Sequence, residues 1–518
     1  MWQRDRQTPI PERWEGLMGG THRVGVERRG IEVVPAGERY GTARGQFWVW
    51  AAANLSMLPV GYGVFVVGLG LAWWQAVLAI LIALAASYPL VGLIALAGSR
   101  TGVPTMKLSR AAFGHAGARL PMLVTYASLI GWEIVSLALG ALATRTVLGR
   151  LSPSLARGPL LVLSFLVMAG LTILLAVYGY HLIQRVQRWI TLIVGEVTLA
   201  YLAIQLAQAH LFSSHGSTGS LPALLGGITL AIAGTGLGWV AGGADYSRYL
   251  PAATRPRSVI GWTALGGGAV QGVLLLAGVL LSTGDPGLAG RVAKDPIGGL
   301  TRQLPTWFLV PYLLAVVLSI VGAAVVDLYS SGIVLQALGV RLPRPAAAGL
   351  DGVLMIAGAA YVVFFAPSFF APFQAFLFTA GSFVAAWAAV FLVDMLLHRD
   401  RGRGYDVPGL DDPAGPYRGW NWPGVGSMLV GAVLGLGLIT SADPRLDRLV
   451  GFLLPEAVRS GPLGSANIGV VVAFFAAGLL YAAVTSRQAT AARARTRHTR
   501  STSSLPGSTP SSAASSSR

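Results

Sequence analysis

The sequence predicts an all-α integral membrane protein of about twelve transmembrane helices. Of its 518 residues, 54% are hydrophobic and only 11% are charged, whereas a typical soluble domain has about 25% charged residues. The apolar residues come in runs of roughly 20, the length of a helix that crosses the hydrocarbon core of a bilayer. We expect these runs to be helices, because an open strand cannot satisfy its backbone in lipid.

The apolar runs divide the chain into a transmembrane domain over 47–485 and two tails. Residues 1–46 form the N-terminal tail, and residues 486–518, rich in Arg, Ser, Thr and Ala, form a C-terminal tail that we expect to be disordered. The Gly/Pro/Asp-rich block 399–420 is expected to be a solvated loop. The twelve spans are expected near residues 47–70, 75–98, 121–148, 159–179, 189–209, 222–243, 259–282, 306–338, 350–366, 371–397, 424–441 and 465–485.

The distribution of basic residues predicts the orientation. An even number of spans places both termini on one side, and 29 of the 38 Lys and Arg residues fall on that side, against nine on the other. Cytoplasmic segments carry this excess, so we expect a multi-pass protein of the cell membrane with both termini cytoplasmic. The same pattern accounts for the net charge of +17, and we expect the lipid bilayer, not nucleic acid, as the partner.

Two of the spans contain helix-breaking sequences. The first includes Pro59, followed by Gly61 and Gly63, and the sixth includes Gly234, Gly236 and Gly238. Breaks in spans one and six are expected if helices 1–5 (47–209) and 6–10 (222–397) are two inverted repeats, followed by two extra helices within 424–485. In transporters built in this way, broken helices meet at the substrate site. The alternative is that Gly and Pro serve close helix packing.

Acidic residues within the spans are candidate functional groups, because charge in lipid is unfavourable. Asp327 and Glu133 are the best placed, since each lies well inside an apolar run. Burial disfavours the charged form of a carboxyl group, so either could take up a proton near neutral pH. A structural hydrogen bond between helices is the alternative for both. Asp245 and Asp394 lie nearer span ends and are expected to reach the interface, beside Arg248 and Arg399.

An aromatic pair provides a candidate binding site. Trp132 and Ser136 are one helical turn apart on one face, and Trp239 follows the glycine break of span six. Two such rings facing a cavity could hold a flat heterocycle between them. The alternative is that both tryptophans belong to an interfacial belt.

Other motifs are missing from the sequence. It has no cysteine, no Walker phosphate-binding loop and no metalloprotease motif. We therefore expect no cofactor and no enzymatic activity, although a membrane-embedded enzyme remains an alternative.

Several of these stretches resemble the nucleobase:cation symporter-1 family, especially its purine–cytosine permease branch. The resemblance covers roughly residues 35–485, and its most specific parts are the loop after span two and the segment after span six. The matching stretches are Trp50–Gly70, Gly102–Pro121, Gly238-Trp239 with Ala244-Asp245-Tyr246-Ser247-Arg248-Tyr249-Leu250-Pro251, Asp327-Leu328-Tyr329-Ser330 with Gln336, and Tyr417–Trp422.

The resemblance implies two inverted five-helix repeats plus two helices, and symport of a nucleobase or related flat heterocycle by alternating access. It implies that Trp132 and Trp239 stack on the substrate, with Gly238 beside Trp239. Ser136 falls where some relatives carry a ring-binding glutamine, and Asp327 where relatives carry an asparagine that binds substrate. Ser56 falls near another polar contact, in the break of helix one.

The coupling ion stays open between sodium and a proton. Relatives that use sodium surround it with helix-one backbone carbonyls, here of Ala52 and Leu55, and with helix-eight hydroxyls, here replaced by Val321 and Gly322. The missing hydroxyls favour a proton at Asp327 or Glu133. A vitamin, hydantoin or allantoin is the alternative substrate, and the sequence leaves the oligomeric state unknown.

Overall fold

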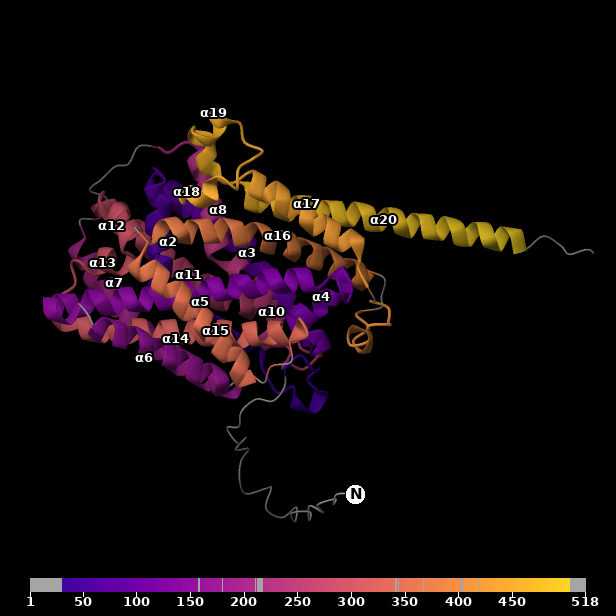
Figure 1. Ribbon diagram of the computed structural model, residues 1–518, viewed down its shortest axis with the longest axis horizontal. Helices are drawn as coiled ribbons and strands as arrows, with labels where there is room; N and C mark the ends of the chain where they lie inside the picture. Colours follow the sequence, from indigo (N-terminus) through magenta and orange to yellow (C-terminus); the bar gives the residue numbers. More distant parts are fainter. Residues whose placement is uncertain are drawn as a thin grey trace, which may run out of the picture.

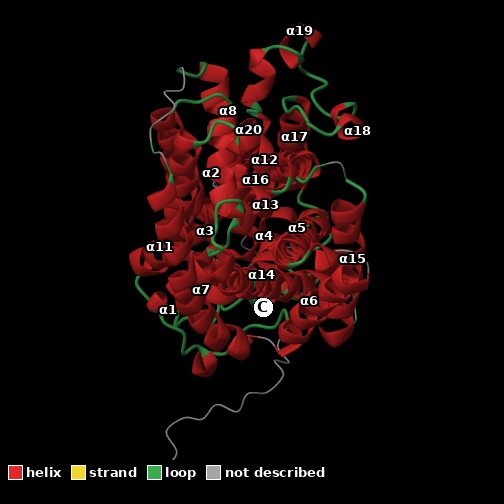
Figure 2. Ribbon diagram, turned by 90° about the vertical axis from the view of Figure 1, so that its left-hand side faces the viewer, coloured by secondary structure: helices red, strands yellow, loops and turns green. Residues whose placement is uncertain are grey.

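The computed structural model describes residues 30–503 apart from 157–158, 179, 210, 212–217, 341, 343, 367, 401–403 and 418. Within these residues the chain forms helices joined by loops and no strand (Figure 2). The predicted all-α class is therefore confirmed for the described part.

Ten long helices form the body of the bundle, and short helices and 3-10 turns connect them. The long helices are α3 (Trp73–Thr101), α5 (Arg119–Leu151), α6 (Pro159–Tyr178), α7 (Tyr180–Gln208), α11 (Pro256–Gly284), α14 (Thr306–Ala337), α15 (Arg344–Phe364), α16 (Phe370–Asp400), α17 (Trp422–Gly437) and α20 (Gly469–Ser503). The short helices are α1 (Ala43–Asn54), α2 (Leu58–Gly68), α4 (Thr105–Phe113), α8 (Leu221–Gly234), α9 (Gly236–Trp239), α10 (Gly243–Ser247), α12 (Leu288–Lys294), α13 (Pro296–Thr301), α18 (Pro444–Asp447) and α19 (Glu456–Arg459). The 3-10 turns are η2 (Ala36–Glu38), η3 (Pro153–Ala156), η4 (Val240–Gly242), η5 (Pro408–Leu410) and η6 (Pro462–Ala466).

Many of these helices have the length and composition of membrane spans. Among the described residues, eight helical segments are long and apolar enough to cross a membrane, and the bent pair α1–α2 makes a ninth. Shorter apolar helices within α6, α15 and α17 lie where the fourth, ninth and eleventh spans are expected. Each expected span thus coincides with helix, while twelve crossings and the inverted repeats remain predictions.

Both expected helix breaks are present. α1 and α2 meet at an angle of 65°, because Leu55 leaves the helical region with φ −86° and ψ 82°. α8 ends before Thr235, which has φ −119° and ψ −123°. A Cβ on Gly236 would lie 2.6 Å from the Ser87 carbonyl carbon, so the break depends on a residue without a side chain. These breaks leave irregular backbone inside the bundle.

The ends of the bundle agree with the predicted sidedness of the connecting segments. α4 lies at the end from which α20 projects, and α12 and α13 lie at the opposite end (Figure 1). The charge count also places α4 and the C-terminus together and α12–α13 opposite. α20 continues to Ser503, into the tail expected to be disordered. Residues 1–29 and 504–518 of the predicted tails lie outside the described residues.

Three segments distant in sequence meet at the α4 end, and we call this contact the inner junction: residues 30–42, α4 with its flanks, and residues 404–421. Lys107 donates from Nζ to Ile31 O at 3.0 Å and pairs with Asp411 at 2.7 Å. Arg110 donates to Leu410 O at 2.8 Å and to Ala337 O at 3.1 Å. The expectation that the whole loop 399–420 is solvated is therefore wrong. The part around Leu410 packs against α4, because it supplies hydrogen-bond acceptors to the buried side chains of Lys107 and Arg110.

The acidic residues expected at the interface are also buried. Asp245 is 2% exposed and accepts from the backbone N–H of Thr105 at 2.9 Å, in the first turn of α4. Arg248 is fully buried and donates to Gly30 O at 2.6 Å and to the Tyr329 hydroxyl at 2.9 Å. Asp394 is buried too, and its carboxylate accepts from the Tyr481 hydroxyl at 2.7 Å. The expectation that Asp245 and Asp394 reach the interface is therefore wrong, since both carboxylates join helices.

Candidate functional site

The two broken spans are connected through the side chain of Asn54, the last residue of α1. Asn54 Oδ1 accepts from Trp239 Nε1 at 2.8 Å and from the Tyr88 hydroxyl at 2.9 Å. Its Nδ2 donates to Trp50 O at 2.7 Å, so the amide also caps its own helix. One buried amide thus fixes the indole of Trp239 relative to α1 and α3.

Trp132 of α5 lies against the backbone of α9 at Gly238. A Cβ on Gly238 would lie 2.9 Å from Trp132 Cζ2 and 3.1 Å from Cε2, so the indole covers a surface that only glycine provides. The other edge of the indole faces α16: its ring centroid is 5.4 Å from that of Phe376 and 6.3 Å from that of Phe373, both near perpendicular. The resemblance places Gly238 beside Trp239, and the structure adds the close approach of Trp132 to Gly238.

Trp239 has a different aromatic neighbour. Its ring centroid lies 5.8 Å from that of Trp50, at an interplanar angle of 76°. Both Trp132 and Trp239 are half-buried, in a region where most neighbouring residues are buried. Trp132 therefore reaches α9 from α5, whereas Trp239 is the last residue of α9 itself. Both side chains are partly exposed.

The residues predicted on α5 point in two directions. Trp132 and Ser136, one turn apart, are both half-buried, whereas Glu133 between them is fully buried. Successive residues on an α-helix are rotated by about 100°, so Glu133 cannot share the face of Trp132 and Ser136. Asp327 on α14 is 3% exposed, and its carboxylate makes no hydrogen bond within the part of the chain that the structure describes.

The remaining predicted residues lie at the break between α1 and α2. Ser56 lines a small hollow with Thr198 of α7 and Ser319 of α14, and neither Trp132 nor Gly238 lines this hollow. Ala52 and Leu55 are buried, and the Ala52 carbonyl accepts from the N–H of Leu55 at 3.4 Å. Among the described residues, no group of three or more His, Asp or Glu is placed to hold a metal ion.

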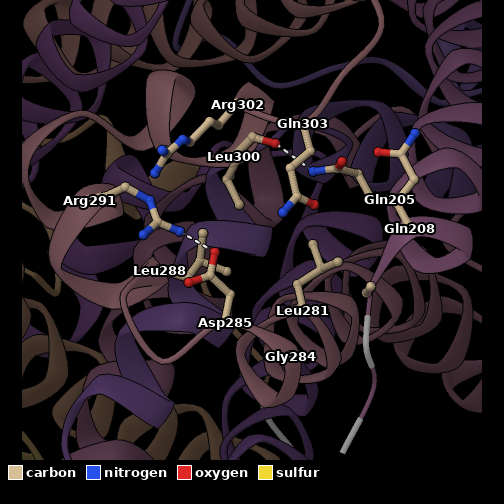
Figure 3. Close-up of a pocket in the computed structure, with 12 residues that line it drawn as sticks. Gln205, Gln208, Leu281, Gly284, Asp285, Leu288, Arg291, Leu300, Arg302 and Gln303 are labelled. Carbon is tan, nitrogen blue, oxygen red and sulfur yellow. Dashed lines mark hydrogen bonds and ion pairs between the residues drawn. The ribbon is translucent and has the colours of Figure 1, made fainter. Parts of the chain in front are cut away.

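The hollow beside Trp132 is lined by four helical segments, one of which is α8 through Ala233. Ser128 and Trp132 come from α5, Leu237 and Gly238 from α9, and further residues including Phe376 from α16. A more polar pocket lies between α7, α11, α12 and α13, near the end of the bundle opposite α4 (Figures 1 and 3). Asp285 and Arg291 form an ion pair there, and none of the predicted site residues lines it. We therefore centre the candidate site on Trp132 and Gly238.

Several residues of this region were not assigned from the sequence. Asn54 was visible as a lone amide at the end of an apolar run, next to the break. Phe373 and Phe376 carry no such signal, because phenylalanine is common in any membrane helix. Asp351 of α15 is fully buried, although its position at the start of an apolar run resembles that of an interfacial residue.

The family model described as "Permease for cytosine/purines, uracil, thiamine, allantoin" matches residues 33–464. The putative purine-cytosine permease YxlA of Bacillus subtilis (strain 168) is 29% identical over 413 residues, which are 77% of this chain and 84% of the relative. Purine-cytosine permease FCY21 of Saccharomyces cerevisiae is 26% identical over 293 residues, 54% of this chain and 53% of that relative.

Solved structures show the same fold. Mhp1, a nucleobase-cation-symport-1 family transporter in a closed conformation with bromovinylhydantoin bound, superposes with a TM-score of 0.66 at 17% identity, over 90% of this chain and 96% of that one. A Na⁺-coupled sialic acid symporter in a substrate-bound outward-open state gives a TM-score of 0.53 at 11% identity, over 86% and 90%. At these identities the similarity concerns the fold alone.

Proposed function

The chain belongs to the family of permeases for cytosine and purines, uracil, thiamine and allantoin, and we propose that it imports cytosine, a purine or a similar planar heterocycle by cation symport. The observation that carries this proposal is the position of Trp132 over Gly238, beside Trp239 on the same broken span. An aromatic face suits stacking on a flat ring, and the missing side chain of Gly238 lets the indole of Trp132 approach the α9 backbone closely.

In this proposal the substrate lies between the indoles of Trp132 and Trp239. Ser136 shares the half-buried face of Trp132 and would read one edge of the ring. Asp327 and Ser56 are the other proposed polar contacts. A heterocycle that lacks the matching group would leave a buried polar atom unpaired, and this gives selectivity.

We propose a proton as the coupling ion. A sodium site at the helix break would use the carbonyls of Ala52 and Leu55, but the matching helix-eight positions, Val321 and Gly322, carry no hydroxyl, and the hydroxyl of Ser319 near this break donates to its own helix at Val316 O. Asp327 and Glu133 are buried carboxyl groups that could carry a proton. For coupling, proton binding must favour the substrate-bound state, after which the helices around the site rearrange and open it to the other side.

Orientation and location belong to the same proposal. The end with α4 and the inner junction would face the cytoplasm and the end with α12 and α13 the exterior, in the cell membrane. The dense polar contacts of the inner junction suit a closed inner side.

A transporter of a hydantoin, thiamine or allantoin is the second candidate. The family description includes thiamine and allantoin, and Mhp1 has bromovinylhydantoin bound. Ser136 in place of glutamine leaves the hydrogen-bond pattern to the ring different from that of relatives. Competition by unlabelled compounds for uptake separates these substrates.

The test is uptake of radiolabelled cytosine, adenine, hypoxanthine and uracil into proteoliposomes with an imposed proton gradient, an imposed sodium gradient or neither. Accumulation of one base driven by protons alone supports the proposal. Accumulation driven by sodium alone would support transport of a base but would overturn the proposal that a proton is the coupling ion. Failure to accumulate any base moves the substrate to the second candidate, and chemical conversion of the base would indicate an enzyme.

A further inference from the structure

A buried carboxylate outside the proposed substrate contacts joins three helices. Asp351 of α15 is fully buried. One of its oxygens accepts from the hydroxyl of Tyr126 on α5, and the other accepts from the hydroxyl of Ser331 on α14 at 2.7 Å. α5, α14 and α15 pack along one another, so this carboxylate lies at their common contact.

Glu133 of α5 lies beside this contact, near the hydroxyl of Ser331, which itself donates to Asp351. It follows Tyr126 by seven residues, two helical turns, so both side chains project from the same face of α5. Glu133 is fully buried, and neither carboxyl oxygen has a hydrogen-bond partner. An isolated ionised carboxylate is strongly unfavourable in such surroundings, so the neutral, protonated carboxyl group is the favoured form.

The charged neighbours of Glu133 are all acidic. Within the described part of the chain, the charges that act on it are Asp351 from α15 and Asp327 from α14, and Tyr126 is the titratable neighbour on α5. From α16, the apolar rings of Phe373 and Phe376 pack on the adjacent Trp132. Since like charges cannot all be held together in a buried site, at least one of these carboxyl groups must carry a proton.

We propose that Glu133 and Asp351 form a proton-binding site between α5, α14 and α15, positioned by the hydroxyls of Tyr126 and Ser331. A proton is the ligand, because two buried carboxyl groups with only hydroxyl partners cannot both be held ionised. Trp132 precedes Glu133 directly in α5, so in this proposal the proton site and the indole over Gly238 share one turn of helix. The coupling to substrate rests on the proposed function, whereas the proton site itself does not.

The first experiment detects the proton on the protein itself. Infrared difference spectra of the full-length protein in lipid are recorded across a pH titration for wild type, Glu133→Gln, Asp351→Asn and Glu196→Gln. Glu196 is the matched control, an exposed glutamate in the apolar α7. We expect Glu133→Gln to remove a buried protonated-carboxyl band, Asp351→Asn to shift that band, and Glu196→Gln to leave it unchanged. If neither of the first two variants alters a carboxyl band, the site is overturned.

The second experiment tests coupling. Accumulation of radiolabelled base under an imposed proton gradient is divided by the rate of base exchange at equal pH on both sides. We expect this ratio to fall at least about tenfold in Glu133→Gln and in Asp351→Asn, and to be kept in Glu196→Gln. An unchanged ratio in both variants overturns the coupling role. If wild type moves no base but the carboxyl band is lost in Glu133→Gln, the proposed function fails and the proton site stands.

Discussion

Trp239 Nε1 and Asn54 Oδ1 lie 2.8 Å apart and form a hydrogen bond. This bond connects the sixth span, where Trp239 ends α9 just after the break, to the first span, where Asn54 ends α1 just before the break. Because the Asn54 amide also accepts from Tyr88 and caps α1, the position of Trp239 depends on the geometry of both interruptions. Movement of either broken span would therefore change the position of the Trp239 indole.

Asn54→Ala removes the acceptor of Trp239 and of Tyr88 together. Leaving buried donors unpaired costs about 1–3 kcal/mol, so we expect the apparent KM for the transported heterocycle to rise roughly tenfold or more. The control is Tyr88→Phe, which keeps the bond to Trp239 and should have a smaller effect. Equal effects of the two variants would show that Trp239 does not depend on Asn54. Uptake kinetics in proteoliposomes measure both.

Gly238→Ala places a methyl group 2.9 Å from Trp132 Cζ2. Overpacking of this kind costs about 1–3 kcal/mol, and we expect a loss of substrate affinity of at least roughly tenfold. The double variant Gly238→Ala with Trp132→Phe should recover part of it, because the smaller ring makes room. Gly261→Ala in α11, where a Cβ meets nothing within 4 Å, is the control. No loss in Gly238→Ala would mean that the indole has room to move away.

Trp132→Ala removes the stacking face itself. Stacking of a base on an aromatic side chain contributes about 1–3 kcal/mol, so binding of the heterocycle should weaken by roughly ten- to a hundredfold, with Trp132→Phe in between. Trp307→Ala, at an indole that is 70% exposed, is the matched control. Unchanged affinity in Trp132→Ala would remove this ring from the substrate site. Isothermal titration calorimetry, or inhibition of uptake by unlabelled heterocycle, measures the affinity.

His115, between α4 and α5, makes the stability of the inner junction depend on pH. Burial lowers the pKa of His115 below its ordinary value of 6.5, and the charges of Arg110 and Arg119 lower it further. As the pH falls below about 6.5, the unfolded chain takes up this proton before the folded protein does, so the folded state loses stability. Thermal unfolding of wild type and of His115→Gln, compared from neutral to mildly acidic pH, measures the effect.

The expected result is a difference in Tm between the two proteins that shifts in favour of His115→Gln as the pH is lowered. Above the ordinary pKa of histidine both states are neutral and the difference should be constant. A difference that stays constant through the acidic range would show that His115 is protonated as easily in the folded protein as in the unfolded chain.

The helices were predictable from the sequence, and the tertiary polar contacts were not. Runs of apolar residues place each helix, and Pro59 and Gly236 mark the two breaks, because these signals are local. The roles of Asn54 and Asp351 depend on partners from distant helices, which no local pattern contains. The docking of the loop around Leu410 was missed for the same reason: its Gly/Pro/Asp composition is typical of solvated chain, and only Lys107 and Arg110 from another segment bury it.

The inner junction has an uneven tolerance to sequence change. Its cations Arg39, Lys107, Arg110 and Arg248 donate largely to main-chain carbonyls, among them those of Val34, Thr101, Ile31, Leu410, Ala337 and Gly30. A carbonyl persists whatever side chain its residue carries. The residues that supply acceptor carbonyls at the inner junction can therefore vary, whereas each Arg or Lys must be kept. Homologous chains should show invariant basic residues next to variable neighbours at this junction.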